Sequence, residues 1–194
     1  MTFNETMDTG VTPTISFAPG VSTTLTSPSV AWTSLNTTYT VTYTLADVNV
    51  EVKGVNVTVT GGMDPAGNPH ASYNETGMFD IDTKAPNVTS IWVSDDNITD
   101  ADVGGYFLVN VNFSEAMDTG VVPNIEFSPD VSTTLKSGTG AWSSGDTVYT
   151  VTYLVVDGNV TETDIDVTVN GYKDLAGNED GATRSDLFDI DILT

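Results

Sequence analysis

The chain has 194 residues, with 27 acidic residues against 5 basic ones and a formal net charge of -22. A surface this negative repels a phosphate backbone, which excludes nucleic acid as a partner. The chain has no cysteine and a single histidine, so disulfides, thiolate metal sites and histidine-rich metal sites are excluded as well. No stretch approaches the roughly 18 apolar residues that a membrane span requires, and we expect no insertion into a membrane.

An internal repeat dominates the sequence. The segment TFNETMDTGVTPTISFAPGVSTTL, from Thr2, returns as NFSEAMDTGVVPNIEFSPDVSTTL, from Asn112. At a constant offset of 110, about 37 of the 67 positions from Thr2 to Asn68 are identical, and FDID recurs at 79–82 and 188–191. Self-similarity of this length indicates a duplicated structural unit. It predicts two domains, residues 1–84 and 85–194.

Apolar and polar residues alternate along both copies, which is the period of a strand with one buried face. In the second copy the pattern predicts about seven strands, in chain order 89–94, 105–114, 123–128, 131–136, 147–156, 164–171 and 187–192. Glycine, asparagine and aspartate separate these segments as turn formers, and valine and threonine dominate within them. Seven strands in about 100 residues is the spacing of an immunoglobulin-like β-sandwich. The predicted fold is therefore all-β, with tandem sandwiches of this kind.

The first copy has no counterpart of residues 87–111, which carry the first two predicted strands of the second copy. A sandwich without these strands has open sheet edges and a partly uncovered core. Three explanations stay open. The chain starts inside a repeat of a longer array, another molecule supplies a strand by donor-strand complementation, or the N-terminal half closes as a reduced sandwich.

Several short motifs carry a resemblance to a known family. They are FSEAMDTG, the strand YTVTY, the pattern D-x-A-G-N before the last strand, and FDIDTKAP where the copies join. With these motifs the chain resembles the immunoglobulin-like repeats of large bacterial surface proteins, such as the extender regions of calcium-dependent, RTX-type adhesins. The resemblance implies an extracellular spacer on the cell surface, with calcium stiffening the domain junctions in some members. The implied partners are neighbouring repeats of the same protein or further copies of the chain.

Acidic residues gather at one predicted end of the second copy, where an immunoglobulin-like topology places the chain entry and the loops after the second and sixth strands. The sequence puts six oxygen-bearing side chains there: Asp80, Asp82, Glu115, Asp118, Asp174 and Asn178. Hard oxygen ligands without nitrogen or sulfur suit Ca²⁺, so calcium is the predicted cofactor and these residues are its predicted ligands. The alternative is a solvated acidic hinge in which Asp174 and Asn178 only form a turn. A second acidic run, DDNITDAD at 95–102, is interpreted as a charged loop.

The preferred function is a structural extender of a surface adhesin, stiffened by cations at the domain junction. Catalysis is not expected, because the paired carboxylates lie in turns and nothing in the sequence builds a pocket around them. One alternative is a self-assembling extracellular filament subunit that uses donor-strand complementation. Another is a carbohydrate- or ligand-binding module, for which Trp32, Trp142 and Tyr106 would form an exposed aromatic row. The near-identity of the two copies favours the spacer.

Overall fold

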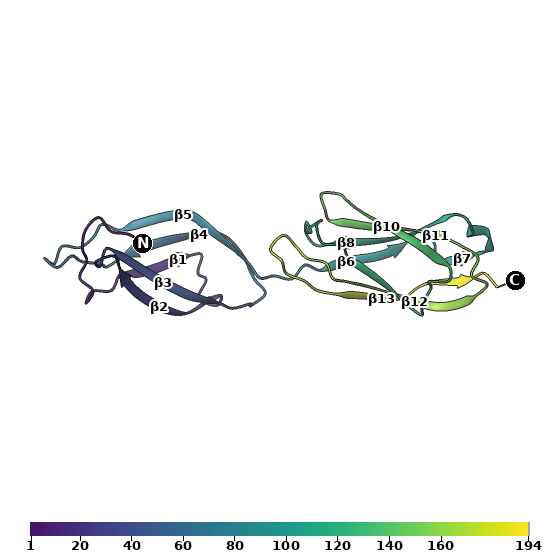
Figure 1. Cartoon of the computed structure of the whole chain (residues 1–194), viewed down its shortest axis with the longest axis horizontal. Coiled ribbons are helices and arrows are strands. Elements are labelled where there is room, and N and C mark those ends of the chain that lie inside the picture. The colour runs from purple at the N-terminus through teal and green to yellow at the C-terminus, as the bar shows by residue number, and fades with distance from the viewer. Residues whose placement is uncertain (194) are drawn as a thin grey trace. The chain divides into compact units, whose positions relative to one another are not determined.

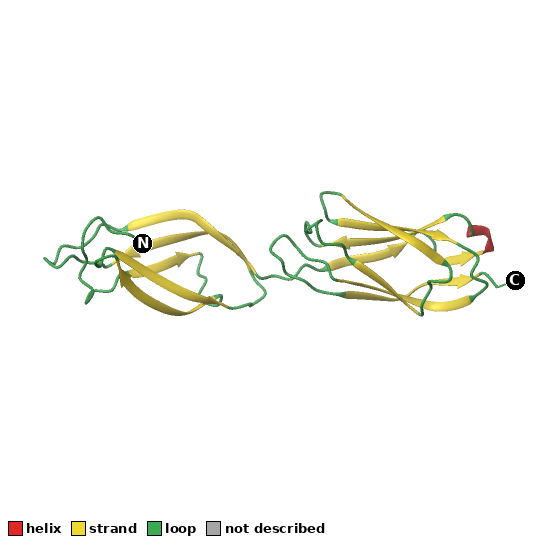
Figure 2. Cartoon of the chain, viewed as in Figure 1, coloured by secondary structure: helices red, strands yellow, loops and turns green. Residues whose placement is uncertain are grey.

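The computed structural model describes residues 1–193 as an all-β chain, with one short 3-10 helix (Figure 2). The described residues divide into two compact units, Met1–Lys84 and a second unit from Ala85 onward. Each unit is described by itself below.

The second unit contains eight strands in two sheets (Figure 1). One sheet has the order β10-β11-β8-β6 and the other the order β7-β13-β12-β9, and among the residues described the β7–β13 pair is the only parallel one. The elements are β6 (Val88–Val93), β7 (Asn97–Thr99), the 3-10 helix η1 (Asp100–Asp102), β8 (Tyr106–Phe113), β9 (Asn124–Ser128), β10 (Leu135–Ser143), β11 (Val148–Val155), β12 (Thr161–Asn170) and β13 (Ala182–Asp191).

Alternate residues of these strands form one hydrophobic core between the two sheets. On β8 the inward set is Phe107, Val109, Val111 and Phe113, all of them buried, as the period of two predicts. Phe107 reaches across to Phe188 of β13, with ring centroids 4.7 Å apart. Two sheets that share one core are consistent with a β-sandwich.

The strands differ most from the predicted ones in two places, and β13 also starts at Ala182 rather than at the predicted residue 187. The segment predicted at 131–136 is largely a turn, because the backbone N–H groups of Thr134 and Leu135 both donate to the Val131 carbonyl, at 3.0 and 2.9 Å. The strand starts only at Leu135 and runs through a Ser/Gly-rich stretch of low β propensity, where it is held by pairing with β11. In the acidic run 95–102, interpreted as a loop, Asn97–Thr99 form β7. This strand exists because the buried Ile98 packs into the core while its backbone pairs with β13.

The first unit contains five strands: β1 (Thr14–Ala18), β2 (Leu25–Thr33), β3 (Thr38–Leu45), β4 (Glu51–Thr60) and β5 (Tyr73–Asp82). They form one sheet of order β1-β4-β5 and a second sheet of β2 and β3. Their registers repeat those of β9 to β13. The pair Trp32↔Tyr39 corresponds to Trp142↔Tyr149, for example. The first unit therefore has the same framework without counterparts of β6, β7 and β8.

The missing strands leave the first unit with a small core. Its cluster of buried apolar residues consists of Val21, Val55 and Ile81, with partly buried neighbours packed around it. Leu45 is 71% exposed, whereas its counterpart Val155 is 2% exposed. The first unit consequently buries much less apolar surface than the second, and burial of this kind is the main source of stability.

Candidate cation site in the second unit

Two loops lie side by side at one end of the second unit: the loop between β8 and β9, and the loop between β12 and β13. The Asp118 backbone N–H donates to the Lys173 carbonyl at 2.9 Å. Met117 and Asp174 form an isolated antiparallel bridge, and the Met117 side chain is buried. A buried apolar anchor and a backbone bridge thus fix the two loops together.

Asp174 is the central carboxylate of this end and is only 2% exposed. Its Oδ1 accepts the backbone N–H groups of Ala176 and Asn178, at 2.8 and 2.9 Å, and its Oδ2 accepts the Asn178 side-chain amide at 2.8 Å. Gly177 completes the loop with a φ of +93°, a conformation that favours glycine. The spacing D-x-A-G-N is therefore that of a loop closed on its own aspartate.

The first unit contains the same loop. Asp64 accepts the backbone N–H groups of Ala66 and Asn68 and the side-chain amide of Asn68, at 2.9, 2.8 and 2.7 Å. The hydrogen bonds from Asn68 lower the pKa of the Asp64 carboxyl, because they favour its charged form. The repeated motif is thus explained by turn closure, which is the alternative that the sequence left open for Asp174 and Asn178. Turn closure and cation binding are compatible, since an ionised carboxylate offers about four lone-pair sites.

Glu115 approaches Asp174 from the neighbouring loop. A carboxylate oxygen of Glu115 lies within 4.8 Å of a carboxylate oxygen of Asp174. The Ser114 hydroxyl also contacts Glu115 Oε1, at 3.5 Å, and Lys173 directs its ammonium group to Glu179 at 3.5 Å. Two negative charges at this separation, one of them buried, form an arrangement that a divalent cation would stabilise.

The other predicted ligands have identifiable structural roles. Asp118 is half-buried in the second unit, and its Oδ1 accepts the Gly120 N–H at 2.9 Å. Asp80 and Asp82 lie on β5 of the first unit and flank the buried Ile81. The Asp80 carboxylate accepts the Gly54 N–H at 2.7 Å, and the Asp82 carboxylate accepts the Lys84 N–H at 3.1 Å. Within the second unit the structure thus brings together Glu115, Asp174 and the amide of Asn178.

The tryptophans of the sugar-binding alternative are half-buried. Trp142 packs on Phe113 and Tyr149, with ring centroids 5.5 and 4.9 Å away, and Trp32 makes the corresponding contacts in the first unit. Tyr106, in contrast, is 72% exposed.

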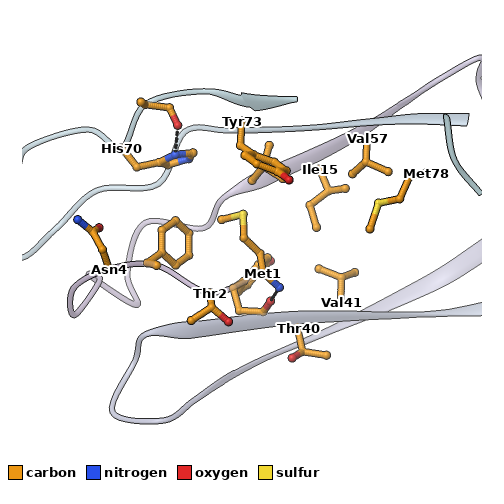
Figure 3. A pocket seen from close by; sticks show the side chains of 14 residues that line it. Met1, Thr2, Asn4, Ile15, Thr40, Val41, Val57, His70, Tyr73 and Met78 are labelled. Carbon is orange, nitrogen blue, oxygen red and sulfur yellow. Dashed lines mark hydrogen bonds between the residues drawn. The ribbon is translucent and has the colours of Figure 1, made fainter. Parts of the chain in front are cut away.

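The sequence did not single out a cavity that the structure shows in the first unit. Its volume is about 760 Å³, and Figure 3 shows that its wall includes Ile15, Val41, Val57, Tyr73 and Met78. The one feature of the sequence that pointed to this cavity was that the first copy lacks a counterpart of residues 87–111.

Comparison of the chain with protein-family models, with curated proteins and with solved structures gave no match. Among the described residues, no helix has the length and apolarity that a membrane span requires. Because no comparison gave a match, the class of protein is described by its fold and by the geometry of Glu115 and Asp174. It is an all-β chain of two units, with a carboxylate pair held between two loops of the second.

Proposed function

We propose that the chain is a structural extender of an extracellular surface adhesin, made of tandem immunoglobulin-like units, with Ca²⁺ bound at the acidic end of the second unit. Three observations support a spacer rather than a catalyst: the repeated framework with equal registers, the loops closed on their own aspartates, and the strongly negative charge. The motifs shared with the repeats of surface adhesins support the same proposal.

The approach of Glu115 to Asp174 carries the calcium part of the proposal. At a separation of at most 4.8 Å, two unit charges repel by about 3 kcal/mol or more at an effective dielectric constant of about 20. A divalent cation between them replaces this repulsion with attraction. Asp174 uses three of its roughly four acceptor positions for the loop, which leaves one for an ion. The amide oxygen of Asn178 is a neutral ligand of the type that Ca²⁺ accepts.

Asp118, Asp80 and Asp82 remain predicted ligands, and stiffening of the domain junction by the ion also remains a prediction. Small-angle scattering of the full chain tests the stiffening. Excess Ca²⁺ is expected to narrow the distribution of conformations relative to the chelated protein. Identical scattering curves in the two conditions would contradict it.

Thermal unfolding of the full chain in excess Ca²⁺ and in a chelator tests the binding itself. Ligand at 100 times its dissociation constant stabilises the folded state by about 2.7 kcal/mol, so the transition of the second unit should move up by several degrees. Glu115→Gln should abolish most of this shift. Glu179→Gln, an exposed control whose carboxylate pairs with Lys173, should retain it. Equal melting of the wild type in both conditions would exclude the proposed site.

A further inference from the structure

One sheet of the second unit carries no negative charge. Its four strands β6, β8, β10 and β11, as the structure describes them, contain no acidic residue, and Lys136 on β10 is their one charged residue. The other sheet differs, because it carries acids such as Glu126 on β9, Asp166 on β12 and Asp189 on β13. In a chain with 27 acidic residues, the outer surface of the sheet β10-β11-β8-β6 is therefore a neutral face.

The first unit repeats this property in its own copy of the sheet. Within the bounds given above, β2 and β3, the counterparts of β10 and β11, contain no charged residue. The outward side chains of the two copies are not the same, since Thr38 stands for Val148 and Thr44 for Leu154. The lack of acidic residues is therefore kept where the residues themselves have changed.

Large side chains project from the neutral face of the second unit. Tyr106 on β8 is 72% exposed, Trp92 on β6 is 48% exposed and Leu154 on β11 is 36% exposed. Tyr106 and Leu154 lie opposite each other in the β8–β11 ladder, so their side chains form one apolar area across two strands. Lys136 lies on β10, at the edge of the sheet. Aromatic residues in a patch depleted of charge are typical of the centre of a protein–protein interface.

Asn110 on β8 lies within this face, with Trp92 and Thr150 opposite it on the two neighbouring strands. Its side chain is only 5% exposed, and its Oδ1 accepts the Thr150 hydroxyl at 2.7 Å. Its Nδ2 has no hydrogen-bond partner among the described residues. A buried donor without an acceptor costs stability, and an oxygen of a docked molecule that displaces the exposed Trp92 ring would supply the acceptor.

The charge of the chain decides which partner fits the neutral face. Two copies with a formal net charge of -22 each repel each other wherever their acidic surfaces meet, so the neutral face is where they approach at the least cost. A basic partner would instead be attracted to the acidic sheet, and Lys136 alone offers little to an acidic one. Because the same face serves both copies, the contact is isologous and has a two-fold axis.

The size of the neutral face sets the expected affinity. Four strands about 4.8 Å apart and about eight residues long, at about 3.3 Å per residue, cover about 500 Å². Burial of this face on both copies amounts to about 1,000 Å², which is the lower limit for a specific interface. The contact is therefore weak and reversible.

We propose that the neutral face of the second unit pairs two copies of the chain side by side, with Tyr106 and Trp92 at the centre of the contact. Salt strengthens the pairing, because it screens the repulsion between the acidic surfaces of the two copies. The pairing requires neither a cation at Glu115 and Asp174 nor the extender function.

Sedimentation equilibrium of the full chain in a chelator measures this pairing without a contribution from Ca²⁺. We expect the average mass to rise reversibly from that of one chain toward that of two as the chain concentration approaches about 1 mM. The rise should be larger in about 0.5 M than in about 0.05 M NaCl. A monomer at every concentration would overturn the proposal, as would an association that salt weakens.

Two substitutions that add the same charge locate the contact. Tyr106→Asp places a carboxylate in the neutral face and should weaken the pairing about tenfold or more. Val122→Asp, at an exposed residue of the loop between β8 and β9, should leave the pairing within about twofold. Pairing that both variants retain would place the contact on another surface and overturn the proposal. A monomeric wild type whose tryptophan fluorescence responds to dextran would assign the face to a neutral sugar and overturn it as well.

Discussion

Asn178 closes its loop onto Asp174 through two hydrogen bonds: its side-chain amide donates to Oδ2 at 2.8 Å and its backbone N–H donates to Oδ1 at 2.9 Å. Asp64 and Asn68 repeat both contacts in the first unit, at 2.7 and 2.8 Å. The motif is the same, but Asp174 is buried and Asp64 is only half-buried.

This difference in burial predicts unequal effects of the same substitution. Asp174→Asn removes a charged acceptor from three donors in a buried loop, and should reduce the free energy of unfolding of the second unit by about 1–3 kcal/mol. Asp64→Asn should reduce the stability of the first unit by less, because water can replace the lost acceptor. Chemical denaturation in a chelator measures both without a contribution from calcium. A larger loss for Asp64→Asn would contradict the role assigned to burial.

A pair of bulge residues offers a second matched comparison. The N–H of Asp164 donates to Asp189 at 2.8 Å, and the N–H of Gly54 donates to Asp80 at 2.7 Å. Both donors have positive φ, +56° for Asp164 and +65° for Gly54, a conformation that costs less for glycine.

Asp164→Gly should therefore raise the stability of the second unit by about 0.5–1 kcal/mol, and Gly54→Asp should lower that of the first by a similar amount. Thermal unfolding of each single variant gives the sign directly. If both variants changed stability in the same direction, the positive φ at these positions would not be the cause of the changes.

Tyr172 predicts a dependence on alkaline pH. Burial, with a smaller contribution from the charge of Asp180, raises the pKa of this phenol to about 12. Because the pKa is raised above its usual value near 10, the associated stability is complete below pH 10 and is lost as the pH rises toward 12.

The Tyr172 hydroxyl is buried without a hydrogen-bond partner among the described residues. Tyr172→Phe should therefore leave stability at neutral pH equal or slightly higher and should reduce its loss between pH 10 and 12. Unfolding curves at pH 8 and pH 11 test this. An unchanged alkaline loss in the variant would remove Tyr172 as its cause.

In the first unit the ring of His70 packs where Tyr172 packs in the second. Tyr172 meets Phe113 edge to face with centroids 4.8 Å apart, and His70 meets the equivalent Phe3 in the same manner at 5.4 Å. The counterpart of Tyr172 is Gly62, where a Cβ atom would lie 2.8 Å from the imidazole.

Gly62→Ala should therefore destabilise the first unit, and much less so in a His70→Ala background. We expect a coupling energy of about 1 kcal/mol in a double-mutant cycle measured by denaturation. If the losses of unfolding free energy from Gly62→Ala and His70→Ala were additive, the added Cβ would not be in close contact with the His70 ring.

Most of the all-β fold was predictable because strands such as β8 and β11 carry an apolar residue at every second position, and most of these residues are buried. β7 was not, because three residues of an acidic run form it, and only the tertiary contact of Ile98 with the core makes it a strand. The start of β10 was also missed, because a turn built on the Val131 carbonyl precedes it, and turns of that kind leave little trace in hydrophobic periodicity.

The acidic end of the second unit was predictable in part. Chain topology was enough to expect the loops that carry Glu115 and Asp174 at the same end. The turn at Asp118 follows from aspartate followed by glycine two residues later, whereas the hydrogen bond of Asp80 to the bulge at Gly54 depends on how β4 and β5 pair. The cavity in the first unit required knowledge of which strands pair, since its wall comes from segments far apart in the chain.

Isothermal titration of the chelator-treated full chain with Ca²⁺ tests the central claim most directly. The geometry of Glu115 and Asp174 predicts saturable binding that Glu115→Gln removes and Glu179→Gln preserves. Absence of binding in the wild type, or equal binding in the wild type and Glu115→Gln, would contradict it.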